Sequence, residues 1–133
     1  MPDMTIEYAG GTKLIAHRRG HQVLTDQPEA DGGQDAALTP TELFIAALAT
    51  CAGYYAVEFA TRHQVSLEGM TIAVEYEYAA RHDRIASVAI RLKLPRHVDE
   101  QLRLAIERSA EQCLVHESLR QPPHVDISVT AGG

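Results

Sequence analysis

The hydrophobic positions of this chain change their period along its length, and each change marks where a different element is expected. Between residues 4 and 25, the short β-favouring runs TIEY, KLIAH and HQVLT are separated by glycines, as in a meander of strands. Residues 71–78 (TIAVEYEY) and 87–94 (SVAIRLKL) alternate strongly apolar with smaller or polar side chains on either side of a polar turn. This second pattern predicts a half-buried antiparallel hairpin.

A long apolar helix is predicted between these two β regions. The residues TPTE at 39–42 provide a threonine cap, a proline at the first helical position and a glutamate that closes a capping box. The helix is expected to extend to about His63, and between Leu43 and Thr61 its only charged residue is Glu58. A helix that is apolar nearly all the way round is buried in a core, an interface or a membrane. A membrane span is disfavoured because the helix also contains Cys, Gly and two Tyr, whereas a dimer that packs two such helices together would bury them.

A second helix, capped by Asp99, is predicted after the hairpin, and the chain is expected to end in a strand over residues 124–129 (HVDISV). The helix places apolar residues at spacings of four, four and three: Leu102, Ile106, Ala110 and Cys113. Cys113 is therefore expected on its buried face. The order of elements predicts an α+β fold in which two main helices pack on antiparallel sheets, within a single domain covering residues 1–133.

Charge and cysteine content limit the classes of partner and compartment. The 133 residues carry a formal charge of −6 and no basic stripe, which argues against nucleic acid as the main partner. The N-terminal residues lack the basic and apolar regions of a secretory signal, so a cytoplasmic location is expected. In a reducing compartment, two cysteines are more often catalytic, redox-active or simply buried than joined in a structural bridge. Cys113 and His116 form a Cys-x-x-His pair, but no second pair exists, so no metal site is expected.

The cysteine in the middle of the central helix, Cys51, admits two interpretations. It shares a helix face with Leu43 and Ala47, and with two tyrosines that follow it. Cys51 and Cys113 are then either small buried hydrophobic residues, as most free cysteines are, or a pair of thiols that the two buried faces bring together. A thiol pair within reach can cycle through a sulfenic acid to a disulfide.

Three segments carry a resemblance to a known family: GHQVLTDQP, GGQDAALTPTELFIAALATC and AEQCLVHESL. With a Pro-x-Glu-Leu motif, an Ala-rich helix reaching a cysteine, a hairpin and a second cysteine about sixty residues later, the chain resembles the OsmC/Ohr superfamily from about Arg18 to Val129. The resemblance implies an OsmC-like, intertwined α+β homodimer with the long central helices at its interface. No cofactor is expected.

The same resemblance implies a thiol peroxidase that reduces organic hydroperoxides in oxidative stress defence. Cys51 would be the peroxidatic thiolate that attacks the O–O bond, and Cys113 the resolving thiol that closes a disulfide. A dithiol, lipoyl in some branches of the family, would then reduce that disulfide.

The family also sets an arginine against the reactive cysteine, which favours its thiolate form. Its Arg-x-Gly pattern is met here by Arg18-Arg19-Gly20. We favour Arg18, and only one of the two arginines can face the site, because successive strand residues point to opposite faces.

The glutamate that orients this arginine in the family has no direct match. Its position, ten residues before Cys51, is occupied by Thr41. Glu42 follows it but lies on the opposite side of the helix from Cys51, and the capping box already explains it. An orienting carboxylate at this end of the helix would have to come from the partner subunit. Glu58, seven residues after Cys51 and on nearly the same face, is an alternative.

Two other functions remain open at this stage. A Cys-His hydrolase would need a histidine beside Cys51, which nothing in the sequence places there. The stronger alternative is a divergent, non-catalytic OsmC-like dimer that binds a hydrophobic ligand or senses redox state, since an apolar lining around Cys51 suits a fatty ligand as well as a bulky peroxide.

Overall fold

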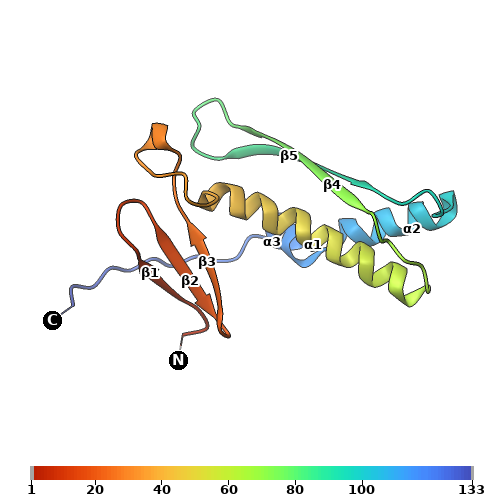
Figure 1. Cartoon of the computed structure of the whole chain (residues 1–133), viewed down its shortest axis with the longest axis horizontal. Coiled ribbons are helices and arrows are strands. Elements are labelled where there is room, and N and C mark those ends of the chain that lie inside the picture. The colour runs from red at the N-terminus through yellow and green to blue at the C-terminus, as the bar shows by residue number, and fades with distance from the viewer. Residues whose placement is uncertain (1, 133) are drawn as a thin grey trace. The chain divides into compact units, whose positions relative to one another are not determined.

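The computed structural model describes residues 2–132, in which the chain forms five strands, one short 3-10 helix and three α-helices (Figure 1). It divides into two compact units, one covering residues 1–47 and the other residues 48–133. The boundary falls inside the first α-helix. We refer to them as the N-terminal and C-terminal units.

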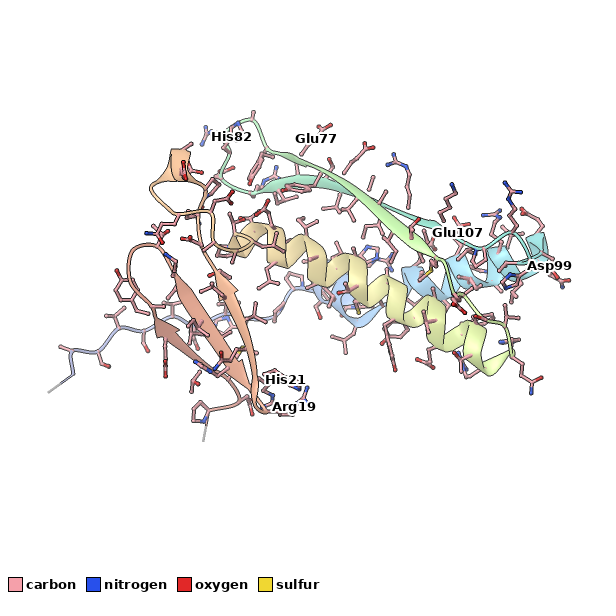
Figure 2. All side chains as sticks on the ribbon, viewed as in Figure 1. Arg19, His21, Glu77, His82, Asp99 and Glu107 are labelled. Atoms are coloured by element: carbon pink, nitrogen blue, oxygen red, sulfur yellow. The ribbon has the colours of Figure 1, made fainter. Side chains whose placement is uncertain are left out.

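The N-terminal unit contains the expected meander. Strands β1 (Thr5–Tyr8), β2 (Leu14–Arg18) and β3 (His21–Thr25) form one antiparallel sheet in the order β1-β2-β3. Arg18 pairs with His21, and the two residues between them, Arg19 and Gly20, both have positive φ angles, 49° and 78°. This is the backbone of a tight two-residue hairpin turn, at whose tip Figure 2 labels Arg19 and His21.

A buried carboxylate organises the connection from β3 to the first α-helix. Asp26 is fully buried, accepts hydrogen bonds from the Thr12 hydroxyl and from the backbone N–H groups of Gln34 and Ala36, and lies 3.9 Å from the ammonium of Lys13. These hydrogen bonds, the one from Thr12 first, hold the pKa of Asp26 well below its usual range. The loop that carries the 3-10 helix η1 (Glu29–Asp31) is thereby fastened to the sheet.

Helix α1 (Pro40–Arg62) begins with the predicted capping box. The Thr39 N–H donates to Glu42 Oε1 at 2.8 Å, and the Glu42 N–H donates to Thr39 Oγ1 at 3.1 Å. Within the described residues, α1 is the one helix long and apolar enough to cross a membrane, a test that a core helix also passes. Its burial is one-sided in the single chain, because Tyr54 and Val57 are exposed.

The C-terminal unit is built on the predicted hairpin. Strands β4 (Thr71–Tyr78) and β5 (Ile85–Lys93) pair antiparallel and run along α1 (Figure 1). Gly53 of α1 lies against Ile72 of β4, since a Cβ atom there would lie 2.7 Å from Ile72 Cδ1. The core of the unit contains the buried residues Ala56, Ala60, Leu67 and Ile106.

The region around Cys113 differs from the prediction. Helix α2 (Glu100–Glu111) is capped by Asp99 as expected, but it ends before Cys113, and a third helix, α3 (Leu114–Arg120), follows. Cys113 is buried, as predicted, but it does not belong to α2, and the helical region predicted as one helix contains two. Cys113 has extended backbone angles and caps α3 instead, because its sulfur accepts a hydrogen bond from the His116 N–H at 3.4 Å.

The strand expected over residues 124–129 is also absent from the described residues, where the chain beyond Arg120 forms no regular element. Val125, Ile127 and Val129 are 70%, 88% and 92% exposed. The alternating pattern is present, but a strand is defined by hydrogen bonds to a neighbouring strand. Neither sheet of the described chain includes this segment.

Candidate functional site

The two cysteines meet inside the C-terminal unit. Cys51 lies on α1 and Cys113 immediately before α3, and both are free thiols. The Cys51 side chain lies close enough to Cys113 to perturb the pKa of its thiol. The structure thus brings together two thiols that lie far apart in the sequence.

The two thiols differ in environment. Cys113 is 1% exposed, whereas Cys51 is half-buried. Burial raises the pKa of Cys113, and the neighbouring Cys51 side chain raises it further, against the opposing hydrogen bond from His116. Cys113 is therefore held as a neutral thiol, and Cys51 is the sulfur with access to solvent.

A cavity of about 460 Å³ adjoins Cys113. Its apolar walls come from α1, from β5 and the residues just after it, and from α2; they are Leu48, Ala52, Val88, Ile90, Leu92, Leu94, Ile106 and Ala110. Four polar residues complete the lining: Arg103, Glu107 (labelled in Figure 2), Glu111 and His116. A volume and lining of this kind suit a small apolar molecule.

Arg18 lies in the N-terminal unit, as the last residue of β2, where its guanidinium donates to the backbone carbonyl of Asp3. Arg19 occupies the hairpin turn. The structure therefore distinguishes the two arginines as a strand residue and a turn residue. A role for Arg18 at the thiols stays a prediction.

The two candidate carboxylates both have local partners. Glu42 is engaged in the capping box with Thr39. Glu58 lies 3.5 Å from the guanidinium of Arg62, one helical turn later. Each of these contacts explains its carboxylate without the thiols, so a catalytic role for Glu42 also stays a prediction.

The sequence analysis did not identify the charged residues that line one edge of the cavity. Arg103, Glu107 and Glu111 lie four residues apart on α2, next to the apolar series that was used to predict the helix. A period-four charged series beside an apolar one was the available signal. Among residues 2–132, no group of three or more His, Cys, Asp or Glu side chains is arranged to hold a metal ion.

Comparison with known proteins identifies the family. The sequence model of the OsmC-like protein family matches residues 32–128, most of the chain. The chain belongs to the OsmC-like protein family. A search of curated proteins found no match.

Solved structures of this family share the fold. A proposed osmotic stress induced and detoxification response protein from Psychrobacter arcticus is 24% identical, with a TM-score of 0.82 over 89% of this chain and 88% of that one. The organic hydroperoxide resistance protein OsmC of Legionella pneumophila is 21% identical, with a TM-score of 0.64 over 88% of each chain. A proposed organic hydroperoxide resistance protein of Vibrio cholerae, with captopril bound in one of its active sites, is 18% identical and has a TM-score of 0.65, over 92% of this chain and 87% of that one. The α+β fold with antiparallel sheets and three helices is therefore that of OsmC-like proteins.

Proposed function

We propose that this OsmC-like protein is a cysteine-based thiol peroxidase that reduces organic hydroperoxides through a Cys51–Cys113 thiol/disulfide cycle. The observation that supports this most is the contact between a half-buried thiol on α1 and a fully buried thiol that caps α3. Family members with hydroperoxide resistance in their names share the fold.

The proposed cycle balances with the groups present and two named reactants. The Cys51 thiolate attacks the terminal oxygen of the hydroperoxide and the O–O bond breaks. The alkoxide that leaves is protonated to the alcohol, and Cys51 becomes a sulfenic acid. Cys113, on losing its proton, attacks that sulfur, water departs, and the Cys51–Cys113 disulfide forms. A dithiol, of the lipoyl class, returns two electrons and two protons and is itself oxidised to a disulfide.

The remaining parts of the proposal concern the assembly. The 133 residues act as one OsmC-like domain of a cytoplasmic homodimer, without nucleic acid or membrane as partner. Arg18 stabilises the Cys51 thiolate, and Glu42, besides closing the cap of α1, is the carboxylate nearest to the family position, supplied by the partner subunit. The exposed Tyr54 and Val57 on α1 support an interface along that helix.

The test is intact mass and peptide mapping after one equivalent of cumene hydroperoxide, and separately of hydrogen peroxide, is added to the reduced protein. We expect rapid loss of two hydrogens and a Cys51–Cys113 cross-link, faster with the organic peroxide. Thiols that stay reduced, or that oxidise slowly and equally with both peroxides, would refute the proposal. The Cys51→Ser variant serves as control, because it should form no cross-link.

The alternative function, a non-catalytic dimer that binds a hydrophobic ligand or senses redox state, is favoured by one observation. The apolar cavity of about 460 Å³ adjoins Cys113 and is able to hold a ligand whether or not the thiols react. Steady-state turnover of an organic hydroperoxide with a dithiol separates the two functions, since a binding protein or a sensor would not sustain it.

A further inference from the structure

The cavity beside Cys113 has chemically different sides. Strand β5 and α1 contribute only apolar side chains to it, whereas α2 contributes Ile106 and Ala110 together with three charged residues. A molecule in this cavity therefore has apolar walls along its length and meets charge only along α2.

The charged side has a net negative charge. The Arg103 guanidinium donates to Glu100 Oε1 at 2.7 Å and to Glu107 Oε2 at 3.2 Å, so two carboxylates already neutralise it. These contacts raise the pKa of Arg103, with the hydrogen bond to Glu100 as the first cause. Glu111, one turn beyond Glu107, makes no ion pair among residues 2–132 and lines the cavity as an uncompensated carboxylate.

We propose that this cavity binds uncharged, extended apolar molecules and discriminates against those that end in a carboxylate, with Glu111 as the residue that sets this preference. The walls accept an alkyl chain, and a carboxylate near α2 would meet the negative charge of Glu107 and Glu111. The only cation on this side, Arg103, is already bound by carboxylates. If the proposed peroxidase function holds, this ligand selectivity is also a substrate preference. The protein then favours neutral hydroperoxides and esterified lipid hydroperoxides over free fatty-acid hydroperoxides.

Binding of three eight-carbon probes, measured by titration calorimetry on the reduced protein at pH 8, tests the selectivity without any redox step. We expect 1-octanol and octylammonium to bind roughly threefold to tenfold more tightly than octanoate, the range that one or two partly solvated carboxylates produce. Equal or tighter binding of octanoate, or no binding of any probe, overturns the proposal.

Variants of Glu111 locate the effect. Glu111→Gln should bring the octanol-to-octanoate affinity ratio close to one, and Glu111→Lys should reverse it. Neither variant removes the ion pairs of Arg103. The matched control is Glu75→Gln, which neutralises an exposed glutamate on β4 that is outside the cavity lining and should leave the ratio unchanged. A ratio that is the same in the wild type and in Glu111→Gln refutes the assignment to Glu111.

The same variants then link the cavity to turnover. We expect the wild type to use the hydroperoxide of methyl linoleate with a higher kcat/KM than that of free linoleic acid, and Glu111→Gln to reduce this ratio. A protein that shows the binding order but does not reduce either peroxide would contradict the peroxidase function and leave the ligand selectivity standing. A protein that reduces both peroxides but prefers the free acid would support the peroxidase function and refute the ligand selectivity.

Discussion

Replacing Cys113 separates its structural role from its chemical role, because the same sulfur caps α3 and contacts Cys51. Cys113→Ser keeps an acceptor for the His116 N–H, and serine is a preferred N-cap residue. Cys113→Ala leaves that N–H without its side-chain partner at a position that is 1% exposed. Both variants lose the same sulfur, so their difference in stability measures the cap.

Loss of an N-cap costs about 0.5–2 kcal/mol, typically about 1. Since the capping atom here is buried, we expect Cys113→Ala to be about 1–2 kcal/mol less stable than Cys113→Ser. For a chain of this size that corresponds to a melting temperature lower by roughly 3–8 °C. Urea unfolding and thermal melting of the reduced variants, each compared with the wild type, provide the measurement.

The chemical role is then tested in Cys113→Ser, the better-folded variant. After one equivalent of cumene hydroperoxide we expect a mass gain of one oxygen at Cys51, trapped with a sulfenic acid reagent, and no loss of two hydrogens. Equal stability of the two variants would refute the capping argument. A serine variant that sustains wild-type turnover with a dithiol would refute the resolving role of Cys113.

Three further predictions follow from contacts in the N-terminal unit. The pKa of Asp26 is lowered in the folded protein, so its carboxylate contributes stability that is complete above the ordinary pKa of about 4 and is lost as the pH falls below that value. In urea unfolding, the wild type and Asp26→Asn should therefore differ less in free energy of unfolding at pH 3 than at pH 7. A difference that does not change with pH would contradict this. Thr39→Ala should lower the free energy of unfolding by about 1 kcal/mol, whereas Glu42→Gln should leave it nearly unchanged because glutamine also closes a capping box. Slower Cys51 oxidation in Glu42→Gln at unchanged stability would support a catalytic role for the Glu42 carboxylate. If Arg18 favours the Cys51 thiolate, Arg18→Ala should slow the reaction of the thiols with cumene hydroperoxide at least tenfold, as measured by stopped-flow. Oxidation of Arg18→Ala at the wild-type rate, or an equal slowing in Arg19→Asn, would argue against this role of Arg18.

Local signals predicted most of the fold. The meander, the hairpin and the start of α1 depend on alternation, turn residues and a capping box that are all contained in short segments. Asp99 was recognised as a cap for the same reason. The end of α2 was not, because Gln112 and Cys113 are compatible with a helix and cysteine is not among the usual N-cap residues, although the Cys113 sulfur caps α3 here.

The candidate site was less predictable than the fold. Spacing placed each cysteine on a buried surface, but the contact between them depends on how the segment joining α2 to α3 turns towards α1, which no local pattern encodes. The charged series of Arg103, Glu107 and Glu111 resembled an ordinary solvated helix face. Its relation to a cavity becomes visible only when β5 and α1 are placed opposite.

Two features of the single chain agree with the proposed homodimer. Residues 124–129 carry the alternation of a half-buried strand, and α1 has the composition of a helix buried on all sides, yet in the single chain Ile127 is 88% exposed and Tyr54 is 61% exposed. Apolar side chains in regular patterns are seldom left in water, because each one buried contributes roughly 1.5–3 kcal/mol. A second copy of the chain would supply both a strand partner for the C-terminal segment and a cover for the exposed side of α1. The proposed role of Glu42 requires the same second copy, so a monomer in solution would contradict both proposals, the homodimer and the role of Glu42.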